Sequence, residues 1–184
     1  MVFLIVYFKY FFHIIILIIM KLILKGKDNG FAFSASHMVP DTICDTMHGH
    51  NYIVDLELLN ADIKNKNIII EKTKEILKKY NNLLLLSNSS FNNSSDSTLS
   101  KMSALKTTVN RVWVYRISFI SNKKRKVYDI PISDVVFLDG IEFITAENLA
   151  VYLKIEIEQN LKNIDENLSL DLVLYEDYNY GVKA

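Results

Sequence analysis

The sequence has few of the residues that mark several classes of protein. It contains one cysteine, two prolines and five glycines in 184 residues. A single cysteine cannot form an internal disulfide, so disulfide-stapled secreted domains are excluded and a cytoplasmic location is expected. Net charge is also absent, because 21 basic residues balance 21 acidic ones and no run of five like charges occurs. A nucleic-acid partner is therefore not expected.

What is present is the composition of one globular domain, with 50% hydrophobic and 23% charged residues. A chain of this length buries roughly two-thirds of the surface that its unfolded form exposes. It needs no metal merely to fold, so a metal site would be functional.

The first 19 residues form a hydrophobic leader, and we expect the working domain to be a single unit over residues 20–184. Residues 2–20 are nearly all apolar and approach the length of about 20 residues that a membrane-spanning helix needs. Lys9 and His13 within the stretch disfavour a span, and no small-residue cleavage site follows. A membrane-associated helix and a buried segment remain alternatives, and no membrane partner is expected unless the leader is an anchor.

Hydrophobic periodicity predicts an α+β fold. Alternating residues predict strands at 20–26, 31–37, 48–59 and 168–176, with a hairpin turn at Asp28–Gly30 between the first two. Helical spacing predicts helices at 70–82 and 144–161, the second capped by Thr145. We expect an antiparallel four-stranded sheet with two helices on one face. Residues 87–130 read as an insertion, a polar loop followed by a hairpin.

Three of the four histidines, His37, His48 and His50, lie close to the sole cysteine, Cys44. His48 and His50 are two positions apart, so on a strand both imidazoles face one side, and a neighbouring strand can add His37. Three imidazoles with an open fourth position are typical of a catalytic Zn²⁺ site. The alternative is three separate surface histidines. Cys44 could be a fourth ligand of a structural site, a buried small residue, or a nucleophile or base.

Four segments together resemble the 6-pyruvoyl-tetrahydropterin synthase family, which includes the 6-carboxytetrahydropterin synthases. They are FSASH, the C-x₃-HGH-N-Y motif, ITAENLAVYL and LVLYED, and they occur in the family's order between Met20 and Glu176. The resemblance implies a tunnel-type fold, in which subunits join their sheets into barrels. It also implies a homo-oligomer with active sites between neighbouring subunits.

The resemblance also implies roles for single residues. His37, His48 and His50 would bind Zn²⁺, and Cys44 would be the catalytic thiolate. Glu176 would hold the ring of a pterin substrate. Thr145 and Glu147 would line the substrate pocket.

Spacing within the motif indicates the reaction. Three residues separate Cys44 from His48, as in the carboxytetrahydropterin synthases that the chain resembles. We therefore expect a zinc-dependent lyase that converts 7,8-dihydroneopterin triphosphate to 6-carboxy-5,6,7,8-tetrahydropterin, for 7-deazaguanine synthesis. The alternatives are 6-pyruvoyl-tetrahydropterin formation, aldolase-type cleavage of the pterin side chain, and a non-catalytic pterin-binding protein.

Two departures from the family pattern bear on these alternatives. Asn81 and Asn82 stand where relatives carry an Asp-His pair, and neither amide can act as an acid or base. This difference favours the binding protein, unless another group takes over the proton transfer. Asp45 stands where relatives with dual activity have Glu, which gives weak support to the aldolase.

Overall fold

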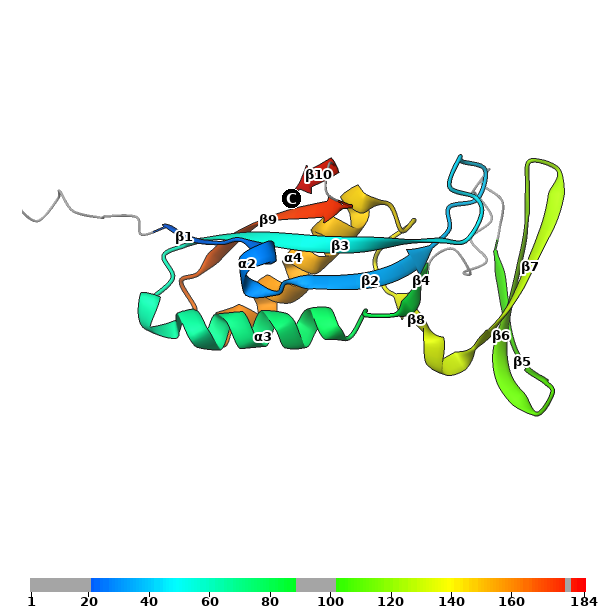
Figure 1. Cartoon of the computed structure of the whole chain (residues 1–184), viewed down its shortest axis with the longest axis horizontal. Coiled ribbons are helices and arrows are strands. Elements are labelled where there is room, and N and C mark those ends of the chain that lie inside the picture. Colours follow the sequence, from blue (N-terminus) through cyan, green and yellow to red (C-terminus); the bar gives the residue numbers. More distant parts are fainter. Residues whose placement is uncertain (1–20, 89–101, 178–179) are drawn as a thin grey trace, which may run out of the picture.

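The computed structural model describes residues 21–88, 102–177 and 180–184, and Figure 1 shows its elements. The predicted leader and most of the predicted polar loop lie outside these residues. The helices and 3₁₀ turns are α2 (Gly26–Asn29), η1 (Ile63–Asn65), α3 (Lys66–Lys78), η3 (Ile132–Asp134) and α4 (Ala146–Lys162). The strands are β1 (Lys21–Leu24), β2 (Ala32–His37), β3 (His48–Leu59), β4 (Leu83–Ser87), β5 (Ser103–Val109), β6 (Val112–Ser121), β7 (Lys124–Pro131), β8 (Val135–Leu138), β9 (Ser169–Glu176) and β10 (Tyr180–Lys183).

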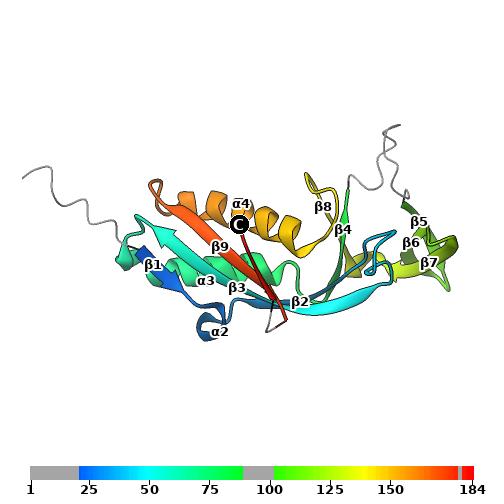
Figure 2. The ribbon, with the colours of Figure 1, turned by 90° about the horizontal axis from the view of Figure 1, so that it is seen from above.

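A large sheet with both long helices on one face confirms the α+β class. Its strand order is β10-β9-β3-β2-β4-β8, with β1 also paired to β3. Helices α3 and α4 pack on this sheet, as Figure 2 shows, and bury apolar side chains such as Leu56, Leu172 and Leu153. Among the described helices, none is both long and apolar enough to cross a bilayer.

The sheet has seven strands rather than the four predicted, and it is not wholly antiparallel. The β2–β4 and β4–β8 pairs are parallel. Strand β4 is a run of four leucines, which lacks the alternation that marks a strand with one solvated face. Leu85 packs in the main core, whereas Leu84 and Leu86 pack in a second apolar cluster on the other side. A strand buried on both faces has no period-two pattern to detect.

The hairpin predicted at Asp28–Gly30 is wrong. Both β1 and β2 pair with β3, so they follow each other along one edge of the same strand. Between them the chain forms the single turn α2, which ends at Gly30 with a left-handed φ of 71°. The turn is held to β3 at its start, because the Gly26 N–H donates to Asp55 at 2.7 Å. A Cβ on Gly26 would lie 2.3 Å from the Val54 carbonyl oxygen, so only glycine fits there.

The predicted insertion forms a second sheet of three strands, in the order β5-β6-β7. The hairpin of β6 and β7 agrees with the prediction, and β5 adds an unpredicted third strand. This small sheet lies at one end of the molecule, beside the loop that joins β2 to β3 (Figures 1 and 2). It packs there through the second apolar cluster, to which β6 contributes Ile117 and Phe119.

Candidate metal centre

Three neighbouring strands, β2, β3 and β9, each carry a row of apolar side chains on one face. Each row gives way to polar side chains at the same end of the large sheet. On β2, the row through Phe33 and Ala35 ends at His37, which pairs with His48 on β3. On β9, the row of leucines ends at Glu176, which pairs with Tyr52. Because side chains alternate along a strand, these register pairs place all the polar groups on the helix-bearing face of the sheet.

The structure brings the three histidines together. One ring nitrogen from each of His37, His48 and His50 lies within 4.8 Å of the others. The Nε2 atoms of His37 and His48 are 3.1 Å apart, and the ring centroids of His48 and His50 are 4.9 Å apart. Such spacing allows three nitrogens to bind one ion at bond lengths near ~2.1 Å after small rotations of the rings.

Each histidine also has a partner for its other nitrogen, which turns Nε2 toward the centre of the cluster. Nδ1 of His48 lies 2.8 Å from the Thr46 carbonyl oxygen, and Nδ1 of His50 lies 3.2 Å from an Asp177 carboxylate oxygen. Nδ1 of His37 contacts the Ile144 carbonyl oxygen. Metal-binding histidines are held in this way, because an Nδ1–H donor leaves Nε2 as the lone-pair ligand.

The buried histidine is also in the right protonation state for a ligand. His37 is only 4% exposed, and burial lowers its pKa below the ordinary value despite the opposing contact with the Ile144 carbonyl. A neutral imidazole is the form that binds a metal ion. The donor set therefore fits an ion with three nitrogen ligands and an open fourth position.

Glu176 lies beside this cluster and already has partners in the protein. Its Oε1 atom is 3.3 Å from Nε2 of His50, and it accepts a hydrogen bond from the Tyr52 hydroxyl at 3.1 Å. Burial, and then the neighbouring Glu176 carboxylate, raise the pKa of Tyr52, so this hydroxyl remains a donor. The structure therefore shows a carboxylate that Tyr52 orients.

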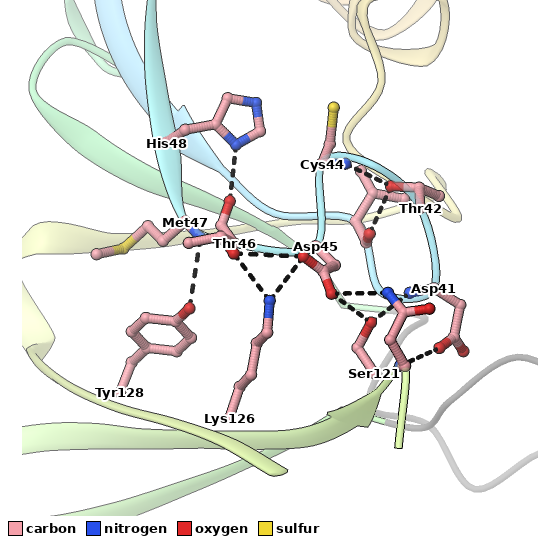
Figure 3. Close-up of polar contacts among 12 residues, drawn as sticks. Asp41, Thr42, Cys44, Asp45, Thr46, Met47, His48, Ser121, Lys126 and Tyr128 are labelled. Carbon is pink, nitrogen blue, oxygen red and sulfur yellow. Dashed lines mark hydrogen bonds and ion pairs between the residues drawn. The ribbon is translucent and has the colours of Figure 1, made fainter. Parts of the chain in front are cut away.

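Cys44 lies in the loop between β2 and β3, partly buried, and does not belong to the group of atoms that could share an ion. Its thiol projects to the same side of the loop as the His48 ring in Figure 3. Cys44 therefore does not lie among the described groups that could act as metal ligands.

Thr145 and Glu147 begin α4 next to the cluster. The Thr145 hydroxyl accepts a hydrogen bond from the Asn148 N–H at 3.3 Å, so it caps the helix as predicted. Glu147 accepts a hydrogen bond from the Tyr180 hydroxyl at 3.1 Å, and its pKa is lowered chiefly by its own backbone N–H. The residue just before this segment, Ile144, supplies the carbonyl oxygen that contacts His37.

Asn81 and Asn82 lie between α3 and β4, and they contact β2. The side-chain oxygen of Asn81 accepts from the Ser34 N–H at 2.9 Å, and the Asn82 N–H donates to the Ser34 carbonyl at 2.6 Å. Asn82 also lines, together with His50, a pocket of about 390 Å³ on β2 and β3. These contacts are structural, and they supply no proton relay.

Sequence reasoning missed the residues that orient the cluster. Tyr52 lies on the same strand face as His48 and His50, which is a signal that could have been used. Asp177 directly follows Glu176, but nothing in the sequence relates it to His50. The carbonyl groups of Thr46 and Ile144 leave no signal, because every residue has one.

Comparisons with known proteins show the family of this chain. The family model of 6-pyruvoyl tetrahydropterin synthase matches residues 28–183. A Methanocaldococcus jannaschii protein, provisionally assigned as a 6-carboxy-5,6,7,8-tetrahydropterin synthase, is 32% identical over 156 residues, which span 79% of this chain and 82% of that protein.

Solved structures show the same fold. A variant of the Plasmodium vivax 6-pyruvoyltetrahydropterin synthase aligns with a TM-score of 0.64 and 20% identity, over 90% of this chain and 96% of that one. The Plasmodium falciparum 6-pyruvoyl tetrahydropterin synthase aligns with a TM-score of 0.62 and 18% identity over the same shares. At these identities the structures establish the tunnel-type fold, and the family model establishes the relationship. The chain belongs to the 6-pyruvoyl tetrahydropterin synthase family, a family of lyases.

Proposed function

We propose that this protein is a zinc-dependent lyase that converts 7,8-dihydroneopterin triphosphate to 6-carboxy-5,6,7,8-tetrahydropterin, for 7-deazaguanine synthesis in the cytoplasm. The observation that carries the proposal is the convergence of His37, His48 and His50, each with its second nitrogen held. The choice of product rests on the spacing of Cys44 and His48 and on the similarity to the Methanocaldococcus jannaschii protein.

The three histidines would hold Zn²⁺, which when bound polarises the side-chain hydroxyls of the substrate and acidifies the adjacent C–H. Cys44 is the base that takes this proton. Glu176 binds the pterin ring, because a carboxylate accepts parallel hydrogen bonds from a ring N–H and the neighbouring amine. Tyr52 holds that carboxylate in place. Thr145 and Glu147 line the same pocket.

We also propose that the active protein is a homo-oligomer with sites between neighbouring subunits. The resemblance of the four sequence segments to the family implies this arrangement. Strands β10 and β8 form the two ends of the large sheet, and backbone groups at sheet edges are satisfied when strands of another subunit pair with them. The mass of the full-length protein in solution, from light scattering, tests the oligomer.

Product analysis tests the reaction. The full-length protein loaded with Zn²⁺ is incubated with 7,8-dihydroneopterin triphosphate, and the products are identified by mass spectrometry. The expected product keeps one side-chain carbon as a carboxyl group, so triphosphate and a two-carbon fragment leave. A product with all three side-chain carbons would identify a pyruvoyl-type enzyme instead, and one with the side chain cleaved off as an aldehyde would identify an aldolase.

A second candidate is a non-catalytic pterin-binding protein, and the structure of the Asn81–Asn82 turn favours it. These amides are used in contacts with Ser34, and neither can transfer a proton. Tight binding of 7,8-dihydroneopterin together with no change in any pterin side chain would select this candidate over the enzyme.

A further inference from the structure

The loop that carries Cys44 is held from one side by the small sheet. It runs from Val39 to Met47, between the two strands that bear the histidines. Within the loop, the Val39 N–H donates to the Cys44 carbonyl at 2.8 Å. Asp45, which follows Cys44, makes its main contacts with the β6–β7 hairpin of the small sheet, as Figure 3 shows.

Asp45 accepts from three donors of the β6–β7 hairpin. The Lys126 ammonium lies 2.6 Å from Oδ1, and the Ser121 hydroxyl donates to Oδ2 at 2.7 Å. The Asn122 side-chain amide donates to the same Oδ2 at 3.1 Å. The side chains of Lys126 and Asp45 are only 18% and 15% exposed, so the pair is better shielded from water than an ordinary surface ion pair.

We propose that Lys126 is a positioning residue, which holds the Cys44 loop against the small sheet through Asp45 and Thr46. The inference deepens the proposed function, and it rests on the role of Cys44 given there. Asp45 and Cys44 are adjacent and project from opposite sides of the loop in Figure 3. Fixing the carboxylate on the hairpin therefore turns the thiol to the side where the His48 ring lies.

The same lysine reaches the residue that orients a metal ligand. The Lys126 ammonium donates to the Thr46 hydroxyl at 2.8 Å, and the Thr46 carbonyl accepts from Nδ1 of His48 at 2.8 Å. One side chain of the hairpin is thus connected to both the thiol and one histidine.

Further contacts hold the loop at its two ends. The Asp41 N–H donates to the Ser121 hydroxyl at 3.0 Å, and the Met47 N–H approaches the Tyr128 hydroxyl at 3.5 Å. Met38, just before the loop, is buried in the second apolar cluster, and Met47 packs against that cluster. The polar contacts therefore lie over an apolar joint between loop and hairpin, which limits the movement of both.

The contacts of Asp45 also separate it from the chemistry. Hydrogen bonds from Lys126 and Ser121 hold the pKa of Asp45 well below its usual range, so the carboxylate stays ionised and engaged at neutral pH. A carboxylate bound to the hairpin does not serve as a general acid or base for a substrate on the other side of the loop. Asp45 therefore supports the loop, and it gives no support to an aldolase activity.

The test uses the fact that Cys44 is the sole cysteine, so its alkylation by iodoacetamide reports on the loop directly. Lys126→Met keeps the aliphatic stem and removes the ammonium. We expect the full-length variant to be alkylated at least about threefold faster, because the loop opens more often. Lys124→Met, on an exposed residue of the same strand, is the matched control and should react at the wild-type rate. Lys126→Arg should restore most of the protection.

A double-mutant cycle decides whether the two residues act through each other. If they do, Asp45→Ala combined with Lys126→Met reacts no faster than the faster single variant. The proposal would be overturned if the increases in alkylation rate of the two single variants multiply in the double variant. A wild-type alkylation rate in Lys126→Met would overturn it as well. An unchanged thermal midpoint shows that each variant is folded. Because alkylation needs no substrate, this readout is independent of whether the protein turns over a pterin.

Discussion

The large sheet and the small sheet both contact the segment from His37 to His50, but in different ways. The large sheet holds its ends by strand pairing, which sets His37 opposite His48. The small sheet holds the loop between them by side chains, chiefly Lys126 and Ser121. One substitution leaves most of the backbone pairing in place, whereas it can remove a side-chain contact completely. The proposed metal ligands therefore lie on the rigid part, and the proposed base lies on the part that a single substitution can loosen.

The largest expected effect separates the two regions by metal content. His48→Ala removes one of three nitrogens on the rigid sheet and should abolish stoichiometric binding of zinc. Lys126→Met should leave one zinc per chain, because it removes no ligand. Metal analysis of the full-length proteins gives the answer, with His13→Ala, at the remaining histidine, as control. Full zinc in His48→Ala would contradict the metal assignment.

The next effect separates binding from turnover. Glu176→Ala should weaken binding of 7,8-dihydroneopterin by about a hundredfold or more, since a charge-assisted pair of hydrogen bonds is lost. Cys44→Ala should bind as wild type and lose turnover. Calorimetry measures the first and product formation the second, and Glu166→Gln on an exposed residue is the control. Wild-type affinity in Glu176→Ala would mean that the pterin binds elsewhere.

A smaller effect tests the group that orients His50. Asp177 has a left-handed φ of 60°, so Asp177→Gly removes the acceptor for Nδ1 without straining the backbone. We expect zinc affinity to fall about tenfold, the lower end for such a partner. Competition with a chromophoric chelator measures the change. Asp177→Asn keeps an oxygen acceptor, so its zinc affinity should fall less. An equal fall in zinc affinity in both variants would show that the contact does not orient His50.

The smallest effect concerns Thr145, which has a structural and a proposed substrate role. Thr145→Ala removes the cap of α4 and should lower the free energy of unfolding by about 1 kcal/mol. Urea denaturation measures this loss, and Thr145→Ser should prevent it. If pterin affinity falls in Thr145→Ala while stability does not, the hydroxyl serves the pocket and not the helix.

Much of the site could be predicted because it depends on local periodicity. Alternation along β3 places His48 and His50 on the face that carries Val54 and Leu56, whatever the strand pairs with. The start of α4 was also predictable, since Thr145 is a good cap before an amphipathic pattern. These features depend on neighbours in the sequence, so the sequence by itself determined them.

Only the tertiary structure decided which distant groups meet. The pairing of β1 with β3, the parallel strand β4 and the contact of Lys126 with Asp45 join segments far apart in the chain. Two of the groups that orient the histidines are backbone carbonyls, which any residue could supply. The sequence determined which face each ligand occupies, because that follows from the strand period. The fold decided which partners turn those ligands toward one point, because long-range packing leaves no local pattern.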